Sequence, residues 1–465
     1  MNTTTSSAPP SGMRDFLPEE VALRDWATAK LIETYQRFGF TRIETPALES
    51  IGNLRRSDGG ENLQLIFEVL HRGKKFEEPF RSLFTSSKFA VPQKLQESAN
   101  HLEEVASNHV STEVAEQIAR SVFKEQIVDL GLRFDLTVPL VRFYANNQSS
   151  LPNPFKSIQI GNVWRAESAQ AGRFRQFTQC DIDTFGIKSE TAEMELIEAT
   201  AEALLALGFK DFVVRLNDRR VLGALANFCE FEQDRHENVF IQIDKLDKIG
   251  IEGVEKELIK NGHAPDTVRK LLQYLTKFAG SQDSDVRKTG VAQFADEEVL
   301  RQLENVIKAV STVANGKYKI VFDPTLVRGM GYYTGQIFEI TDPGYSSSIA
   351  GGGRYDKMVG KMSGRDVPAV GFSIGFERII AILSERKSGL SGEQEKLAVI
   401  YDVERDDMEQ VLKLAKEKRD AGTIVSLLPR KKEMKKQLDA LAAQGFAFFA
   451  VYKTDASKLE IKELG

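Results

Sequence analysis

The stretch GNVWRAESAQAGRFRQFTQCDIDTFG, residues 161–186, decides the fold class. Two runs of strand-forming residues flank a loop of small residues from Ser168 to Gly172, which predicts an antiparallel hairpin. Because successive side chains on a strand point to opposite faces, the second strand has one polar and one apolar face. The polar face carries cations, a ring, an amide and carboxylates: Arg173, Arg175, Phe177, Gln179, Asp181 and Asp183.

The polar face of this hairpin has the groups that a polyphosphate, a purine and a small zwitterion would need. Arg165 and Glu167 lie on the preceding strand, across the turn. A guanidinium can bind two phosphate oxygens at once, and a phenylalanine ring can stack on a purine. The alternative is an ordinary hairpin with one solvated face and scattered charge pairs. Four further segments of the chain favour the ligand site.

Size and composition set the limits for any function. A chain of 465 residues predicts two to four domains, and 42% apolar with 28% charged residues is typical of a soluble globular protein. A net charge of −5 restricts nucleic-acid binding to local basic patches. Two cysteines make no disulfide framework and suit a reducing cytosol, so we expect a cytoplasmic protein. No zinc-spaced cluster and no membrane-length apolar run is present.

The order of periodic segments predicts a discontinuous core with a separate C-terminal domain. Residues 1–216 form the first part of the core and residues 316–385 the second, with a mainly helical domain, residues 217–315, inserted between them. Polar residues 386–396 are a linker by composition. Strands and helices then alternate through residues 397–465, which predicts a small α/β domain.

A second insertion is predicted inside the first part of the core. Residues 76–127 are strongly polar, yet four branched apolar residues recur at every fourth position: Val110, Val114, Ile118 and Val122. That spacing forms one stripe on a helix. We therefore expect a largely helical insertion packed on the core, with a disordered loop as the weaker alternative.

Asp135 and Thr137 in the segment RFDLT, residues 133–137, combine a carboxylate with a hydroxyl. Two residues apart on a strand, these groups point the same way and can accept hydrogen bonds from an ammonium group. Taken alone, the segment slightly favours a simpler reading in which one of them caps the following helix.

Glycine-rich segments form the remaining candidates. RGMGYYTG, residues 328–335, and AGGGRYD, residues 350–356, would let the backbone approach a ligand closely, although each alone predicts a tight turn. In GFSIGFER, residues 371–378, Arg378 lies in the first turn of a predicted helix. The helix dipole slightly disfavours a cation there, which indicates either a ligand or, by default, a surface ion pair.

Together these segments resemble class II aminoacyl-tRNA synthetases, and specifically the histidyl-tRNA synthetase family. Residues 38–50, 163–177 and 370–379 resemble the three motifs of the class. RGMGYYTG and AGGGRYD resemble the elements specific to the histidine enzymes. The resemblance covers nearly the whole chain except the segment 76–127 and the detail of 217–315.

The resemblance implies an α+β fold in which helices flank an antiparallel catalytic sheet, a homodimer, and a C-terminal anticodon-binding domain that is abbreviated here. It also implies L-histidine, ATP with bound Mg²⁺ and tRNA(His) as ligands. Catalytic cations would be Arg328 and Arg165. The ATP site would comprise Arg165, Glu167, Arg173, Phe177 and Arg378. The histidine site would comprise Asp135, Thr137, Gln179, Asp183, Tyr333 and Tyr355. The protein would provide no dedicated metal site.

The chain departs from the family pattern at a few places. Gly331 stands where the family more often has aspartate, and Asp135 and Asp183 are the shorter acid where many members have glutamate. The basic segment PRKKEMKK, residues 429–436, predicts either a contact with RNA phosphates or a solvated lysine-rich helix.

Three other readings compete with the synthetase. The nearest is a non-catalytic paralogue that serves as a regulatory subunit of ATP phosphoribosyltransferase in histidine biosynthesis. Such paralogues usually lose site residues and the anticodon domain, whereas this chain keeps Arg165, Gln179, Arg328 and Tyr333. Another class II synthetase, such as the glycyl, threonyl or prolyl enzyme, is disfavoured by the two glycine-rich elements. A non-catalytic RNA-binding module is disfavoured by the acidic net charge.

Overall fold

The structure is a computed structural model that describes the chain in several stretches: residues 7–56, 65–72, 127–167, 174–278, 280, 282–329, 331–345, 347–386, 396–453 and 460–464. The predicted insertion 76–127 lies outside the described residues except for its last residue, and Arg173 lies outside them as well. The chain divides into two compact units, residues 1–387 and 388–465.

The first unit is built on a sheet of eight strands in the order β1-β5-β6-β11-β10-β9-β7-β8. All neighbours are antiparallel except the outermost pairs β1/β5 and β7/β8. The strands are β1 Thr41–Arg42, β5 Phe155–Trp164, β6 Gln176–Phe185, β7 Val213–Asp218, β8 Lys319–Phe322, β9 Gln336–Thr341, β10 Ser348–Arg354 and β11 Ala369–Ile374. The predicted α+β class with an antiparallel sheet flanked by helices is confirmed.

The predicted hairpin is the β5–β6 pair, which runs in register from Phe155 opposite Phe185 to Trp164 opposite Gln176. Cys180 and Ile182 on β6 are fully buried in the main core. The apolar face of β6 therefore packs into the protein, and the alternation predicted for this strand is confirmed.

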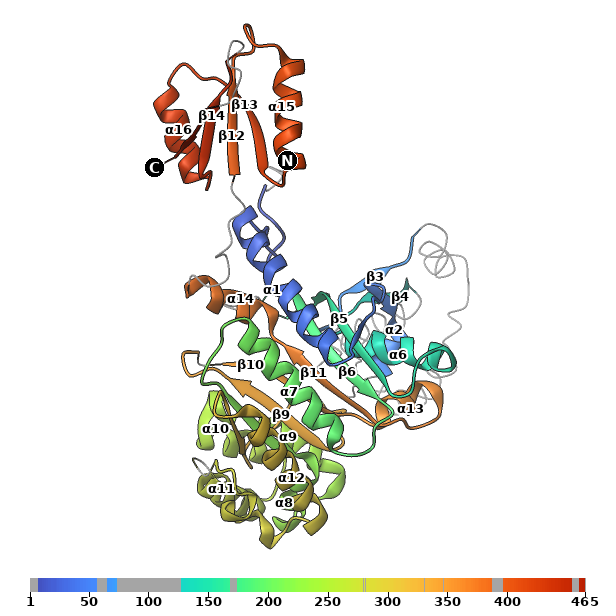
Figure 1. Ribbon diagram of the computed structural model, residues 1–465. Helices are drawn as coiled ribbons and strands as arrows, with labels where there is room; N and C mark the ends of the chain where they lie inside the picture. Colours follow the sequence, from blue (N-terminus) through green and yellow to red (C-terminus); the bar gives the residue numbers. More distant parts are fainter. Residues whose placement is uncertain are drawn as a thin grey trace, which may run out of the picture. The chain divides into compact units, whose positions relative to one another are not determined.

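Helices α1 Pro18–Arg37, α7 Thr191–Ala206 and α14 Phe376–Glu385 pack over one face of this sheet (Figure 1). Helix α1 has proline at its start, acidic residues in its first turn and Arg37 in its last, which suits the helix dipole. Its buried stripe includes Leu23, Ala27 and Leu31, which join the main core with residues of α7. Burial of this apolar stripe fixes α1 on the sheet.

A smaller sheet lies beside the hairpin in the order β2-β4-β3, with β2 Leu48–Ser50, β3 Glu68–Leu70 and β4 Val128–Leu132. Helices α2 Ile51–Arg56, α6 Thr137–Asn147 and α13 Lys357–Ser363 accompany it. Phe155 and Phe185 from the hairpin and Tyr144 from α6 share a second core cluster. This cluster anchors α6, whose first turn faces the site described below.

The segment FTRIETP, residues 40–46, has the β-branched and aromatic residues typical of a strand, yet it forms only the two-residue strand β1. Arg133 explains the early end, because its Nη1 donates to the Thr45 carbonyl at 2.7 Å and so occupies an acceptor that a neighbouring strand would need. Pro46 adds to the effect, since it has no N–H to donate.

A helical segment connects β7 to β8. Its helices are α8 Arg219–Phe228, α9 His236–Ile243, α10 Leu246–Lys260, α11 Pro265–Phe278 and α12 Glu297–Ala314. Short 3₁₀ turns are η2 Gln148–Ser150 after α6, and η3 Gln233–Arg235, η4 Val286–Thr289 and η5 Val291–Gln293 within the segment. Its apolar residues belong to the same core cluster as the sheet. The segment is therefore packed on the sheet rather than tethered to it.

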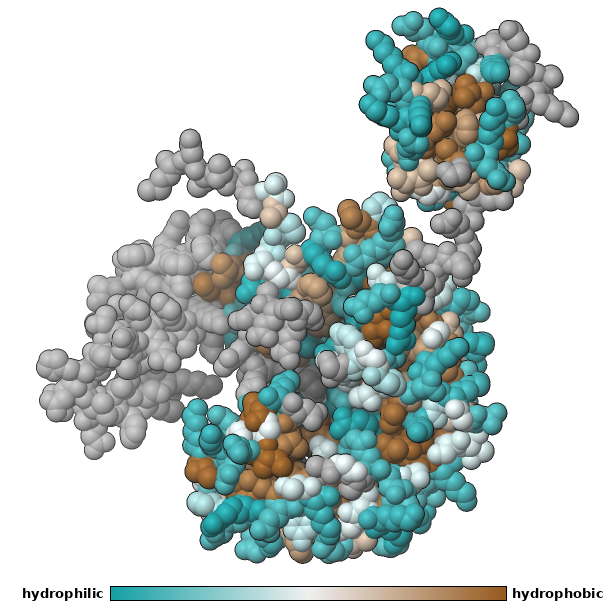
Figure 2. Space-filling view, turned by 90° about the vertical axis from the view of Figure 1, so that its left-hand side faces the viewer, coloured by the Kyte–Doolittle hydropathy of each residue, from teal (hydrophilic) through white to brown (hydrophobic). Residues whose placement is uncertain are grey.

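The second unit is a small α/β fold with the strand order β13-β12-β14-β15. Its elements are β12 Lys396–Tyr401, α15 Met408–Asp420, β13 Ile424–Pro429, α16 Met434–Ala443, β14 Phe448–Val451 and β15 Ile461–Glu463. Two apolar clusters of its own stabilise the sheet. Figure 2 shows apolar side chains gathered on one face of this unit, between hydrophilic margins. Across the described parts of both units, no helix meets the length and apolarity that a bilayer crossing requires.

Candidate active site

A pocket of ≈ 360 Å³ opens on the large sheet and is lined mainly by β6, β10 and β11. It brings together all the site residues predicted from the sequence that the structure describes: Asp135, Thr137, Arg165, Glu167, Phe177, Gln179, Asp183, Arg328, Tyr333, Tyr355 and Arg378. Arg173 is among the residues that the structure does not describe. Asp181, Ser348 and Ser373 also line the pocket, although the sequence assigned them no role.

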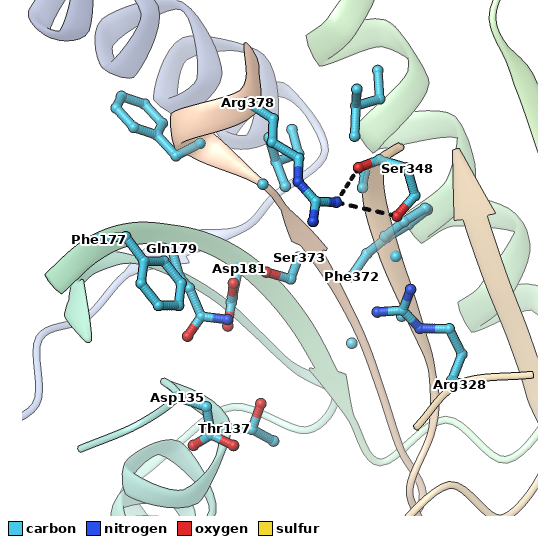
Figure 3. A pocket seen from close by; sticks show the side chains of 18 of the residues that line it. Asp135, Thr137, Phe177, Gln179, Asp181, Arg328, Ser348, Phe372, Ser373 and Arg378 are labelled. Carbon is cyan, nitrogen blue, oxygen red and sulfur yellow. Dashed lines mark hydrogen bonds between the residues drawn. The ribbon is translucent and has the colours of Figure 1, made fainter. Parts of the chain in front are cut away.

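The β6 wall presents Phe177, Gln179 and Asp181 to the cavity (Figure 3). Gln179 Oε1 and Asp181 Oδ1 are buried and have no hydrogen-bond partner among the described residues. A buried acceptor without a donor is costly, so two such atoms side by side indicate a ligand that brings N–H groups. The alternation of β6 was the sequence signal for Asp181, which lies on the same face as Gln179.

Asp183 lies deeper on the same strand. Its Oδ1 accepts a hydrogen bond from the Tyr355 hydroxyl at 2.5 Å. Burial raises the pKa of Asp183 well above its usual range, the charge of Asp181 raises it further, and the bond from Tyr355 opposes both effects. Gly371 of β11 pairs with Asp183, and a Cβ at Gly371 would lie 2.1 Å from Asp183 Oδ1. Only a glycine leaves the carboxylate this position.

Asp181 shares the polar wall with two other carboxylates. Burial is the main reason why its pKa rises to about 7, and the charge of Asp135 adds to the rise. A hydrogen bond with Ser373 and the charges of Arg165 and Arg133 act in the opposite direction. The Asp181 carboxyl is therefore poised to change protonation near neutral pH, and a cationic ligand would favour its ionised form.

Asp135 serves the local structure as well as the pocket. Its Oδ1 accepts from the backbone N–H of Val138 at 3.0 Å and so satisfies a donor in the first turn of α6. The Gln159 amide donates to the Leu136 carbonyl at 3.1 Å and fixes the turn between Asp135 and Thr137. The capping and ligand roles are compatible, because Asp135 also lines the cavity.

Three arginines line the pocket: Arg165 on the side of the β6 wall, and Arg328 and Arg378, which Figure 3 shows across from Phe177. Arg328 Nη1 donates to Glu339 Oε2 at 2.8 Å, and Arg378 Nη1 donates to the backbone carbonyl of Ser348. Arg165 Nε donates to the Phe134 carbonyl at 3.1 Å, and its guanidinium carbon lies 5.0 Å from the centroid of the Phe177 ring. Each guanidinium thus has a protein acceptor and also lines the cavity.

The glycines of AGGGRYD lie inside β10 rather than in a turn. A Cβ at Gly351 would lie 2.5 Å from Arg328 Nη1. The guanidinium of Arg328 therefore rests directly on the β10 backbone, which a larger residue would prevent. The reading of this glycine run as a tight turn is wrong, and the predicted close approach of a ligand stays a prediction; in the structure the group that approaches the backbone is Arg328.

No cluster of three or more His, Cys, Asp or Glu side chains suited to a metal ion is found within the described stretches. Among the pocket residues that the structure describes, the carboxylates do not form a cage of the kind that Mg²⁺ or Ca²⁺ requires.

Comparison with known proteins identifies the family. The family model described as "Histidyl-tRNA synthetase" matches residues 96–379. A histidine–tRNA ligase of Leifsonia xyli subsp. xyli is 41% identical over 465 residues, covering 98% of each chain. The chain belongs to the histidyl-tRNA synthetase family. The resemblance stated from the motifs is thereby confirmed.

Solved structures of the histidyl-tRNA synthetase family have the same fold. A histidyl-tRNA synthetase from Nostoc sp. PCC 7120 superposes with a TM-score of 0.70 at 26% identity, covering 99% of this chain and 95% of that one. An ATP phosphoribosyltransferase regulatory subunit/histidyl-tRNA synthetase from Bacillus halodurans gives a TM-score of 0.69 at 20% identity, with 97% and 100% covered. At that identity the second likeness concerns the fold alone.

Proposed function

We propose that this chain joins L-histidine to tRNA(His) in two steps. Histidine and ATP first form histidyl-adenylate with release of pyrophosphate, and the histidyl group then passes to the 3′-terminal adenosine of the tRNA. The observation that carries this proposal is one pocket that is lined both by three arginines and by buried acceptors without a partner among the described residues. The acceptors suit the ammonium group of an amino acid, and the arginines suit the phosphates of a nucleotide.

In the first step, a carboxylate oxygen of histidine forms a bond to the α-phosphorus, and the bond from that phosphorus to the β-phosphate oxygen breaks. The nucleophile is already anionic, so no general base is needed. Catalysis then depends on alignment and on fixed positive charge around the phosphorus. Arg165 and Arg328 line the cavity and supply that charge, and Mg²⁺ bound with ATP would neutralise the departing pyrophosphate.

Selection of histidine falls to the carboxylate end of the pocket. Asp183 and Tyr355 form a buried pair that can hydrogen-bond the imidazole, with Tyr333 nearby on the same cavity wall. The acceptors of Gln179 and Asp181 suit the ammonium group, together with Asp135 and Thr137. An amino acid without matching donors would leave these buried groups unpaired, which costs on the order of 10⁴-fold in selectivity.

In the second step, a ribose hydroxyl of the tRNA attacks the carbonyl carbon of the mixed anhydride, and AMP leaves. We assign catalysis to residues 1–216 and 316–385 and anticodon binding to residues 397–465, joined by the linker 386–396. The second unit supports this with exposed lysines around the start of α16: Lys431, Lys432, Lys435 and Lys436. A homodimer in the cytoplasm completes the proposal.

ATP–pyrophosphate exchange, measured with each standard amino acid in turn, tests the proposal. We expect exchange that depends on histidine and on no other amino acid. Exchange with none would leave a regulatory, non-catalytic role, and exchange with a different amino acid would indicate another class II synthetase.

A further inference from the structure

The guanidinium of Arg328 ends a row of alternating charges that crosses three strands. Arg328 Nη1 donates to Glu339 Oε2 at 2.8 Å. The other oxygen of Glu339 accepts from Arg215 Nη1 at 3.2 Å, and Arg215 Nε donates to Asp323 Oδ2 at 2.6 Å. Arg215 and Glu339 are direct cross-strand partners on β7 and β9, so the sheet register itself builds the row.

The far end of this row is held by the helical segment between β7 and β8. Gln282, from the turn after α11, donates through Nε2 to Asp323 Oδ2 at 2.6 Å. Its neighbour Asp283 bridges to Phe322 of β8, since the Phe322 N–H donates to the Asp283 carbonyl at 2.8 Å. Asp323 is fully buried, and its Oδ1 accepts from the backbone N–H of Thr325 at 2.9 Å. One carboxylate thus joins the helical segment to the loop that carries Arg328.

The same helical segment also approaches the loop from α9. A Cβ at Gly329 would lie 3.0 Å from Asp244 Oδ2, just beyond the end of that helix. Burial tends to lower the pKa of Arg328, but Glu339, Tyr333 and Asp244 outweigh burial and keep it above its ordinary value. Helices α8 to α12 lie together beside β9 in Figure 1. The Gln282 contact with Asp323 and the Asp244 contact with the Arg328 loop therefore come from the same helical segment.

The Arg328 guanidinium is held by the charged Glu339 at its Nη1 atom, and the Tyr333 hydroxyl also interacts with it. Arg328 Nε is buried and has no hydrogen-bond partner among the described residues. The floor under the guanidinium is the backbone at Gly351, which offers no side chain to hold it. Loss of the Glu339 contact would therefore let the guanidinium turn, and a group that stabilises developing charge must be fixed before reaction.

We infer that Glu339 and Arg215 are positioning residues for Arg328, and that the segment 219–315 holds this row in place through Gln282. The inference rests on the proposed function, in which Arg328 acts on the α-phosphate. Neither Glu339 nor Gln282 lines the pocket, so both act through Arg328 rather than on substrate.

Steady-state ATP–pyrophosphate exchange with histidine, on the full chain, tests the inference. Glu339→Gln should lower kcat about 100-fold while the KM values for histidine and ATP change by less than about threefold. Glu339→Asp should recover part of that loss. Gln282→Ala should lower kcat about 10-fold. Gln293→Ala is the matched control, because this exposed amide of the same segment donates to the Gly290 carbonyl and accepts from the Tyr274 hydroxyl, and neither group belongs to the charged row.

An unchanged kcat in Glu339→Gln, or a loss confined to KM, would overturn the positioning role. If Glu339→Gln does not fold by circular dichroism, Gln282→Ala carries the test, and a rate equal to that of Gln293→Ala would overturn the link to the segment. A wild-type chain that exchanges with no amino acid would overturn the proposed function and the inference together. An active wild type with fully active variants would overturn the inference alone.

Discussion

Asp181 and Asp183 occupy the same wall of the pocket, yet the structure gives them different tasks. Asp183 is bound by the Tyr355 hydroxyl and covered by Gly371, so its carboxylate is fixed before any ligand arrives. Asp181 keeps an unpartnered buried oxygen among the described residues. At the scale of single residues, the Asp183 carboxylate is therefore held in position by the protein, whereas Asp181 has an oxygen that can accept a hydrogen bond from a ligand.

Asp183→Asn removes one acceptor without changing shape. We expect KM for histidine in the exchange reaction to rise about 100-fold, because a hydrogen bond in a buried site is lost. The KM for ATP should stay within about threefold, since the arginines of the pocket are untouched. A rise in the KM for ATP with an unchanged KM for histidine would contradict the assignment of Asp183 to the histidine site.

Asp181→Asn tests the pKa of Asp181 through stability. The folded pKa of about 7 lies above the ordinary value of 3.8, so the folded state holds the proton more tightly than the unfolded chain. This contribution to stability is complete below the ordinary pKa and is lost as the pH rises to about 7. Urea unfolding should find the variant more stable than the wild type at pH about 8, by more than about 1 kcal/mol, with a smaller gain at pH about 5. An equal difference at both values would contradict the shifted pKa.

Much of this wall was predictable, because a strand period of two places Phe177, Gln179, Asp181 and Asp183 on one face wherever the strand pairs. The second partner of Glu339 was not predictable. Arg215 lies opposite Glu339 through the β7–β9 register, which joins segments more than a hundred residues apart and depends on the whole sheet. Local periodicity contains no information about such a register.

At the scale of elements, two neighbouring glycines of β10 lie close to different kinds of atom, a side chain at Gly351 and a paired backbone at Gly352. A Cβ at Gly351 would meet the end of the Arg328 side chain, which can move aside. A Cβ at Gly352 would lie 2.0 Å from the carbonyl oxygen of Gly371 on β11, and a backbone atom in a paired strand cannot move aside. Taken alone, the run predicted a tight turn; only pairing with β9 and β11 makes it the interior of a strand.

Gly351→Ala and Gly352→Ala form a matched pair that tests this difference. Gly351→Ala should lower kcat for exchange about 100-fold with little change in melting temperature, because it displaces a catalytic side chain. Gly352→Ala should lower the free energy of unfolding by about 1–3 kcal/mol, the usual cost of overpacking. Equal destabilisation by both substitutions would contradict the assignment of Gly351 to Arg328.

At the scale of the whole molecule, the chain consists of a larger unit that contains the pocket and a smaller unit with its own apolar clusters. The composition break near residues 386–396 predicted the boundary region, because a linker need not bury apolar surface. The function of the second unit could not be predicted from composition. A lysine-rich helix start suits both RNA phosphates and plain solvent.

Replacing Lys431, Lys432 and Lys435 by alanine decides between these alternatives. We expect KM for tRNA(His) in aminoacylation to rise at least about 10-fold and its salt dependence to weaken, because each lost phosphate contact reduces counterion release. Exchange without tRNA should be unchanged. The matched control replaces Lys413 and Lys416, exposed lysines on α15, and should behave like the wild type. Identical tRNA kinetics in both variants would assign the α16 lysines to solvent.

The most direct test of the account is a crystal structure with a non-hydrolysable histidyl-adenylate analogue. In this structure Arg165 lies over Phe177, and Arg328 donates a hydrogen bond to Glu339. We predict that both guanidinium groups lie within hydrogen-bonding distance of the α-phosphoryl oxygens, with the imidazole against Asp183 and Tyr355. Should either arginine point away from that phosphoryl group while the analogue is bound, the catalytic role given to the pair is wrong.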